Sequence, residues 1–288
     1  MNPKVSIILP SYNHRRYLQE RLDSIFNQTF QNFEVIILDD ASTDGSQSIF
    51  QENQSHPKIS HYFINQVNTG SPFKQWQRGL KLAKGEFVWI AESDDSCELN
   101  FLETNLKVLD ENPDVTIVVA KTQKYNQGKA QGEVQHHIFK DNDQEEINQN
   151  NINFCPILNV SSCVFKNPKL VSFKTEFPSY KLIGDRVFYH EFFYNKMVIK
   201  NNQTSSYFRK EEESVSTLNL KGIEYLQNYF NEHHRFITYV NLEQKLPKKV
   251  YNGYISKFFK RVRDRLDKKQ KLSLSYLSIL LKYKLSLK

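Results

Sequence analysis

Residues 86–96 read EFVWIAESDDS, an apolar stretch followed directly by acidic side chains. The apolar part has the length and composition of a buried strand. Asp94 and Asp95 follow it as adjacent carboxylates, which repel each other and lose solvation at the end of such a strand. A divalent cation such as Mn²⁺ or Mg²⁺ removes that cost, and these metals also suit a diphosphate. The stretch therefore indicates a metal–nucleotide site, with an ordinary Asp-Asp turn as the alternative.

The sequence before this stretch alternates between strand patterns and helix patterns. Buried strands are predicted at 5–9, 33–38 and 59–64, ahead of the fourth at 87–91. Helices are predicted at 15–28 and 73–83, and a third runs through Phe50 after a turn at 42–45. Such alternation predicts an α/β fold with a parallel, doubly wound sheet and a ligand site outside the carboxyl ends of its strands.

Polar side chains follow the end of each predicted strand or its turn. These clusters are Pro10, Ser11, Tyr12 and Asn13; Asp39 and Asp40; Asn68, Thr69 and Gly70; and Asp94 and Asp95. Because the carboxyl ends of parallel strands meet at one edge of a sheet, we expect all four clusters to face one crevice. Each cluster alone is a weak signal, and their convergence is what favours a ligand site.

The composition is that of a folded chain with a basic end. In 288 residues, 39% hydrophobic and 13% aromatic residues permit a substantial core. Three separated cysteines match no disulfide frame or zinc site, which favours a reducing cytoplasm. We predict no signal peptide and no membrane span. Residues 245–288 contain fourteen Lys and Arg against two acids, whereas residues 1–244 contain twenty-five against thirty.

In four of its stretches the chain resembles the family 2 glycosyltransferases of the GT-A fold. The stretches are VSIILPSYNHRRYLQERLDSIFNQTF (5–30), FEVIILDDASTDGS (33–46), NTGSPFKQWQRGLKLAKGEFVWIAESDD (68–95) and IGDRVFYHEFF (183–193). The resemblance is close over most of residues 4–110 and looser over 155–217, and it does not extend to the last 50 residues. It implies a Rossmann-like sheet and an inverting, metal-dependent enzyme that uses a nucleotide sugar.

The resemblance also implies roles for the acidic residues. Asp95 would ligate Mn²⁺ or Mg²⁺, and Asp94 would bind the ribose or assist with the metal. Asp40 would contact the base, usually uracil, because a carboxylate can accept the imide N–H. A helix-capping turn is the alternative for Asp40, and Asp39 is expected to be structural.

The remaining nucleotide-binding residues follow from the same resemblance. The loop of residues 10–13 would lie under the nucleotide, with the Tyr12 ring packed on the base or, alternatively, in the core. Asn68 belongs to the turn beside the nucleotide. Lys74 would hold a phosphate as a point charge, or be an ordinary solvated helix lysine.

An inverting enzyme needs a general base to deprotonate the acceptor hydroxyl. Asp185 is the candidate that the resemblance places in this segment, with a helix N-cap as the alternative role. His190 and Glu191 are weaker candidates on the same predicted helix. Glu211 stands where many relatives carry a histidine near the metal, and it is a doubtful metal ligand for which solvent exposure is the alternative.

The basic end of the chain has its own pattern. Apolar residues recur at three- and four-residue spacing from Val250, with Lys and Arg between them, and a second apolar segment covers 272–287. This predicts a basic amphipathic helix. Its apolar stripe would pack on the parent domain or a partner, or it would dock residues 250–288 on an anionic membrane surface. Nucleic acid is disfavoured as a partner because the rest of the chain is acidic.

These observations define one functional hypothesis. Residues 1–218 would form a GT-A domain, with a nucleotide-sugar half (1–110) and an acceptor half (111–218), and residues 219–288 a helical appendage. The enzyme would transfer a hexose or N-acetylhexosamine from a UDP-sugar to a glycan or lipid-linked acceptor, in surface polysaccharide synthesis. It would be cytoplasmic, with a peripheral position at the cytoplasmic membrane. The alternatives are a catalytically degenerate scaffold that docks on membrane or polymer, and a nucleotidyltransferase, which would need a Gly-rich loop that PSYNHRR lacks.

Overall fold

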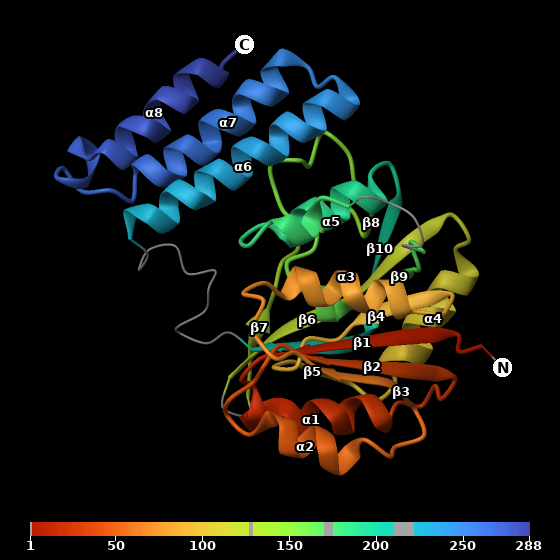
Figure 1. Cartoon of the computed structure of the whole chain (residues 1–288). Helices are drawn as coiled ribbons and strands as arrows, with labels where there is room; N and C mark the ends of the chain where they lie inside the picture. Colours follow the sequence, from red (N-terminus) through yellow and green to blue (C-terminus); the bar gives the residue numbers. More distant parts are fainter. Residues whose placement is uncertain (1, 127–128, 170–174, 210–221) are drawn as a thin grey trace.

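The computed structural model describes residues 2–126, 129–169, 175–209 and 222–288 (Figure 1). Its centre is one mixed sheet with the strand order β3-β2-β1-β4-β9-β6-β10-β5, to which β7 and β8 add at β6 and β10. The strands are β1 (Val5–Ser11), β2 (Phe33–Asp39), β3 (Ile59–Ile64), β4 (Phe87–Ile90), β5 (Ser96–Cys97), β6 (Val115–Asn126), β7 (Lys129–Glu133), β8 (Gln144–Glu146), β9 (Cys163–Lys166) and β10 (Met197–Arg209). The helices are α1 (Arg15–Phe26), α2 (Ser46–Asn53), α3 (Pro72–Leu82), α4 (Phe101–Glu111), α5 (Gly184–Phe193), α6 (Ile223–Gln244), α7 (Lys248–Arg263) and α8 (Leu274–Ser286).

The first half of the sheet has the predicted parallel arrangement. β1 pairs in parallel with β2 and β4, and β2 pairs in parallel with β3. Pro10 lies opposite Leu38 and Ser11 opposite Asp39, so the polar ends of β1 and β2 emerge side by side. The other half is mixed, because β9 runs antiparallel to both β4 and β6 while β6 and β10 are parallel. The predicted α/β class is confirmed.

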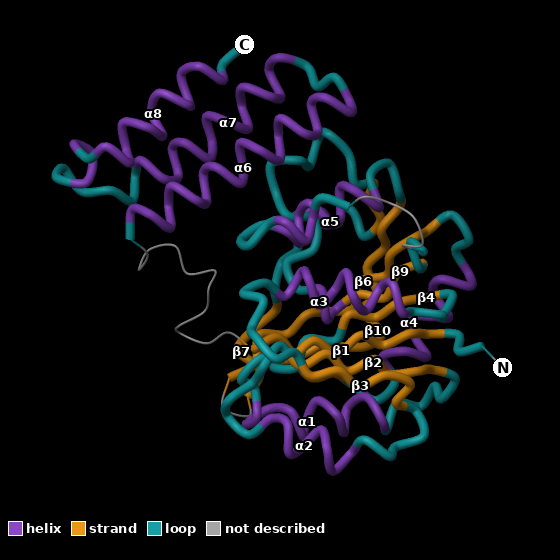
Figure 2. Tube along the Cα trace, viewed as in Figure 1, coloured by secondary structure: helices purple, strands orange, loops and turns teal. Residues whose placement is uncertain are grey.

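Helices cover both faces of the sheet (Figure 2). Ile7 and Leu9 share one buried cluster with residues of α1, α2 and α4, whereas Ile8 belongs to the cluster that contains residues of α3 and α5. Alternate residues of a strand point to opposite faces, so residues 5–9 are all fully buried. Continuous apolar runs, rather than alternation, are the sequence pattern of such doubly covered strands.

The C-terminal helices α6, α7 and α8 lie side by side next to α5 (Figure 1). The apolar stripe predicted on α7 is buried in the same cluster as residues of α5 and α6. Phe258 of α7 stacks on His233 of α6, with ring centroids 3.5 Å apart, and His233 Nδ1 lies 2.6 Å from the Tyr254 hydroxyl. The stripe of α7 therefore packs on the rest of the chain, which was one of the two predicted roles. Because it is buried there, it is not free to dock on a membrane.

Among the helices that the structure describes, none has the length and apolarity to cross a bilayer. The division into a 1–218 domain and a 219–288 appendage stays a prediction.

Two helical glycines provide a test of how tightly α3 packs on the sheet. A Cβ at Gly79 would lie 2.4 Å from Ile8 Cγ2, whereas a Cβ at Gly253 of α7 would meet no atom within 4 Å. We expect Gly79→Ala to destabilise the protein by about 1–3 kcal/mol through overpacking. Gly253→Ala is the matched control and should stabilise it by up to about 1 kcal/mol through helix propensity. Urea unfolding measures both, and equal effects of the two substitutions would contradict the packing.

Candidate active site

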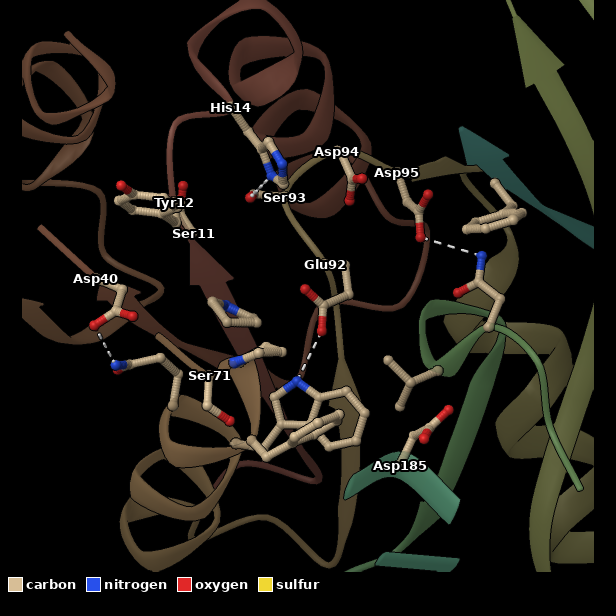
Figure 3. Close-up of a pocket in the computed structure, with 18 of the residues that line it drawn as sticks. Ser11, Tyr12, His14, Asp40, Ser71, Glu92, Ser93, Asp94, Asp95 and Asp185 are labelled. Atoms are coloured by element: carbon tan, nitrogen blue, oxygen red, sulfur yellow. Dashed lines mark hydrogen bonds between the residues drawn. The ribbon is translucent and has the colours of Figure 1, made fainter. Parts of the chain in front are cut away.

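One pocket of about 560 Å³ opens at the carboxyl ends of the parallel strands (Figure 3). Most of the residues singled out from the sequence line it: Pro10, Ser11, Tyr12, Asp40, Asn68, Asp94, Asp95 and Asp185. They come from β1, from the loops after β2, β3 and β4, and from the first turn of α5. The clusters therefore converge on one crevice, as expected, and α5 adds a residue from the second half of the chain.

Asn13 and Lys74 were predicted to be part of this site, but neither lines the pocket. Asn13 has a left-handed backbone with φ of 55°, and its Oδ1 accepts the Thr43 N–H at 2.8 Å. It thus links the loop after β1 to the loop after β2. Lys74 is exposed on α3, where its Nζ lies 3.4 Å from the Thr69 carbonyl oxygen. Their roles toward a nucleotide stay predictions, and Glu211 lies outside the described residues.

Asp40 is held by several donors from the protein. Oδ1 accepts from Asn65 Nδ2 at 2.7 Å and from Gln75 Nε2 at 2.8 Å, and Oδ2 accepts from the Thr69 hydroxyl at 2.8 Å. Because a carboxylate has about four acceptor positions, little capacity is left for a base N–H. Asp40 does not cap a helix, because the N-cap of α2 is Gly45. Asp39 holds the turn after β2, where its Oδ1 accepts the Ser42 N–H at 2.9 Å. Asp40 thus fixes the turn at 68–71 to the end of β2.

The acidic cluster after β4 contains a third carboxylate that the sequence analysis missed. Glu92 lines the pocket, and its Oε1 accepts from Trp76 Nε1 at 2.7 Å. Burial, and next the charge of Asp94, raise the pKa of Glu92 to about 8. In the sequence, Glu92 stands directly between the strand and the pair Asp94 and Asp95, and this position could have identified it as a site residue. A carboxyl group that is neutral near pH 7 therefore lies beside the two predicted metal ligands.

Asp95 is held in a fixed position from the second half of the sheet. Asn159 Nδ2 donates to its Oδ2 at 3.2 Å, and the Arg209 backbone N–H donates to its Oδ1 at 3.1 Å. Burial, and next the charge of Asp94, raise the pKa of Asp95, while the buried Arg21 guanidinium lowers it. Without a bound cation, its surroundings therefore favour the protonated form of Asp95. A metal ion would need the same carboxyl group to be ionised.

Asp185 lies in the first turn of α5, and the N-cap position belongs to Ile183. The predicted N-cap alternative is therefore wrong, because the helix begins at Gly184, two residues earlier than that role requires. Oδ1 of Asp185 accepts the Arg186 N–H at 2.8 Å, and Oδ2 lies 3.3 Å from Cys155 Sγ. Burial raises the pKa of Asp185. A raised pKa suits a group that takes up a proton near neutral pH.

The weaker candidates on α5 have structural roles and do not line the pocket. His190 is buried, and its burial lowers its pKa to about 3, so it stays neutral. Glu191 accepts the backbone N–H groups of Glu176 at 2.6 Å and Phe177 at 3.2 Å. Asp185 is thus the acid of this helix that reaches the pocket.

His14 is a further lining residue that the sequence analysis did not single out. Its Nδ1 lies 2.8 Å from the Ser93 hydroxyl, which connects the loop after β1 to the acidic stretch (Figure 3). It directly follows the predicted 10–13 loop, and that position was the only signal for it. Asn159 and Tyr189 also line the pocket. Asn159 carried no sequence signal because it comes from a distant segment, whereas Tyr189 lies four residues after Asp185 on the same predicted helix.

In the described residues, no three His, Cys, Asp or Glu side chains are grouped so that they could hold a metal by themselves. Asp94 and Asp95 supply two carboxylates to the pocket. Mg²⁺ and related hard cations are commonly bound by one or two carboxylates, with phosphate oxygens and water as the other ligands. The donor set therefore fits a cation that is bound together with a diphosphate.

The sheet and the position of its acidic pocket define a protein of the GT-A fold. The profile of the family described as Glycosyl transferase family 2 matches residues 6–166, which is more than half of the chain. The chain belongs to this family.

The chain is similar to curated relatives over part of their length. Glycosyltransferase GlyG of Streptococcus pneumoniae is 33% identical over 130 residues, which cover 44% of this chain and 42% of that protein. The GalNAc(5)-diNAcBac-PP-undecaprenol beta-1,3-glucosyltransferase of Campylobacter jejuni is 35% identical over 109 residues, with 38% and 35% covered. The matched regions thus span less than half of each relative.

Two solved structures share the fold over nearly the whole chain. S. aureus TarS 1-349 in complex with UDP-GlcNAc has a TM-score of 0.74 at 20% identity, with 99% of this chain and 82% of that chain covered. Mannosyltransferase PcManGT from Pyrobaculum calidifontis in complex with GDP-Man and Mn²⁺ has a TM-score of 0.54 at 15% identity, with 99% and 87% covered. At these identities the likeness shows the fold.

The raised pKa of Glu92 predicts how the stability of the ligand-free protein depends on pH. The ordinary glutamate pKa is 4.5 and that of Glu92 is about 8, so the folded state binds this proton more tightly than the unfolded state. The stabilisation is fully present below pH 4.5 and is lost as the pH rises toward 8. We expect the melting temperature to fall by several degrees between about pH 6 and about pH 8.5.

Glu92→Gln should make this dependence shallower because glutamine does not titrate, and the raised pKa of Asp95 should account for the slope that remains. Glu52→Gln, at an exposed position on α2, is the matched control and should keep the slope of the unaltered protein. An unchanged slope in Glu92→Gln would show that the burial of Glu92 does not govern it.

Proposed function

We propose that this chain transfers a hexose or N-acetylhexosamine from a UDP-sugar to a glycan or lipid-linked acceptor, with inversion at the anomeric carbon. Surface polysaccharide synthesis is the process that we infer for it. The observation that carries the proposal is the convergence of Tyr12, Asp94 and Asp95 with Asp185 in one pocket. The first three follow strands of the parallel half of the sheet, and Asp185 comes from α5, which lies between β9 and β10 of the mixed half.

The donor half of the pocket suits a nucleotide diphosphate. Tyr12 has 44% of its surface exposed at the pocket, so its ring is available to a base. Asp94 and Asp95 would hold Mn²⁺ or Mg²⁺, which supplies positive charge to the departing diphosphate. Asn159 and Arg209 fix the Asp95 carboxylate from the second half of the sheet. This arrangement restricts the carboxylate to one position before any ligand binds.

Asp185 would act on the acceptor. Its carboxylate takes the proton of the acceptor hydroxyl while that oxygen attacks the anomeric carbon. The bond from the anomeric carbon to the diphosphate oxygen breaks on the opposite side, and its electron pair leaves with UDP. Attack opposite to the leaving group inverts the configuration. The contacts with Arg186 N and Cys155 Sγ hold the Asp185 carboxylate in place for this step.

The comparisons support the choice of donor and metal. TarS was solved with UDP-GlcNAc and with UDP, and PcManGT with GDP-Man and Mn²⁺. The name of the Campylobacter relative states a lipid-linked glycan acceptor. A cytoplasmic location stays a prediction.

Asp95→Ala tests the metal site. We expect Mn²⁺ together with UDP to raise the melting temperature of the unaltered protein, because both bind only the folded state. Asp95→Ala should lose this shift and should lose metal-dependent turnover. Asp114→Ala, at an exposed position, is the control and should keep both. If the unaltered protein showed no shift with UDP under any metal condition, the degenerate scaffold would be the better description.

Asp185→Asn tests the general base. Asparagine has nearly the same shape but cannot take up the proton, so we expect kcat to fall by about 10²- to 10⁴-fold. The affinity for UDP should stay unchanged, because the residue belongs to the acceptor side. Calorimetry and a transfer assay with a panel of nucleotide sugars measure the two quantities. Strong residual transfer by Asp185→Asn would exclude Asp185 as the base.

A further inference from the structure

One face of α8 exposes a row of leucines. Leu274, Leu277, Leu281 and Leu285 are 85%, 49%, 59% and 77% exposed. They recur at spacings of three or four residues and therefore form one stripe along the helix. We call this stripe the leucine face. Single exposed leucines are ordinary on protein surfaces, but a continuous apolar stripe marks an interaction surface.

The opposite side of α8 anchors the helix to the chain. Tyr276 and Ile279 are buried in the cluster that includes α6 and α7. The Tyr283 ring stacks on Phe259 of α7, with centroids 4.0 Å apart and planes 3° apart. The leucine face is therefore held outward by packing on the other side of the helix. Figure 1 shows α8 at the outer edge of the three C-terminal helices. It also contacts α6, where Lys282 Nζ donates to Asn231 Oδ1 at 2.7 Å.

The charge of the segment that carries the leucine face has a single sign. Residues 268–288 contain six lysines and neither aspartate nor glutamate. At 3.6 residues per turn, Lys284 lies on one side of the leucine face and Lys282 on the other. Both lysines are exposed. Lysines that flank an apolar stripe can keep their ammonium groups among lipid headgroups while their stems lie along apolar surface.

We propose that the leucine face docks on an anionic lipid surface. The leucines would enter the boundary between headgroups and acyl chains, and the flanking lysines would contact the negative headgroups. The sequence pattern pointed to residues 250–288 as a whole, but the structure buries the stripe of α7. The docking element is thus α8.

The charge of this segment favours a lipid surface over a second copy of the chain as the partner of the leucine face. Two leucine faces packed together would bring the lysines of 268–288 close to each other, with no acid in the segment to compensate them. A lipid surface that carries negative charge attracts the same lysines. Both partners would bury the leucines, so the single sign of charge decides between them.

The position of α8 also relates to the acceptor, and this step rests on the proposed transferase function. Lys282 lines a second hollow of about 950 Å³, together with Lys181 and Arg235. Leu182 lines both this hollow and the candidate active site. A lipid surface on α8 would therefore lie next to a hollow that borders the reaction pocket and carries three cationic side chains and the acidic Glu232. That placement suits an acceptor whose lipid end stays in the membrane.

Sedimentation with lipid vesicles tests the proposal on the full chain. Vesicles of phosphatidylcholine with about 30% phosphatidylglycerol should bind the protein at about 0.05 M salt, and pure phosphatidylcholine should bind it much less. Raising the salt to about 0.5 M should weaken binding because the lysine charges are screened. Leu274→Ser with Leu285→Ser should lower the partition coefficient by about tenfold or more.

The matched control changes two exposed apolar residues elsewhere. Val67 and Leu99 are 77% and 49% exposed, lie outside α8 and do not line the second hollow, so Val67→Ser with Leu99→Ser should bind like the unaltered protein. Lys284→Glu should weaken binding to the anionic vesicles alone. Circular dichroism checks that each variant keeps its helices.

Two outcomes would overturn the proposal. One is equal binding of the unaltered protein and the Leu274→Ser, Leu285→Ser variant. The other is a dimer in light scattering that the leucine variant loses, without vesicle binding, which would assign the leucine face to a second copy. UDP binding in solution should be unchanged in the leucine variant. A failure of vesicle binding therefore does not bear on the transferase function, whereas loss of UDP binding in the unaltered protein does.

Discussion

The central strands β1, β2 and β4 are buried on both faces, and this constraint determines where the protein can place polar chemistry. Residues 5–9, 35–38 and 88–91 are fully buried in the two clusters on either side of the sheet. An unpaired polar side chain within those runs would lose its hydration without compensation. Polar side chains therefore gather where the strands end, and the parallel pairing brings these ends to one edge. The pocket with Asp40, Asp94 and Asp95 follows from that arrangement.

The same pocket combines two effects that oppose each other. Burial and mutual repulsion raise the pKa values of Glu92 and Asp95, which disfavours their ionised forms. A divalent cation would reverse this preference at Asp95, and binding would then release a proton. Asn159 and Arg209 hold the Asp95 carboxylate from the second half of the sheet, so the donor site depends on both halves. The acidic stretch is a binding site only in the context of the complete fold.

The C-terminal helices use the same apolar patterning for two purposes. On α7 the apolar stripe is buried against α6 and completes the core beside α5. On α8 the buried residues Tyr276 and Ile279 fix the helix, and the leucines on its other face remain exposed. Both segments look alike in sequence, as basic and amphipathic. Their difference comes from packing, because the apolar residues of α7 face other elements of the chain, whereas α8 packs on α6 and α7 by one side and leaves its leucines exposed.

The amino-acid sequence by itself determined the four parallel strands, the helices between them and the convergence of the polar clusters. These features depend on local periodicity and on chain direction, both of which can be read along the sequence. Only the tertiary structure decided that Glu92 and His14 join the pocket, that Asn13 and Lys74 lie outside its lining, and that α5 begins ahead of Asp185. It also decided which amphipathic helix keeps an exposed face. Burial, and the pKa shifts that it causes, depend on contacts between segments far apart in the chain, and no local pattern encodes them.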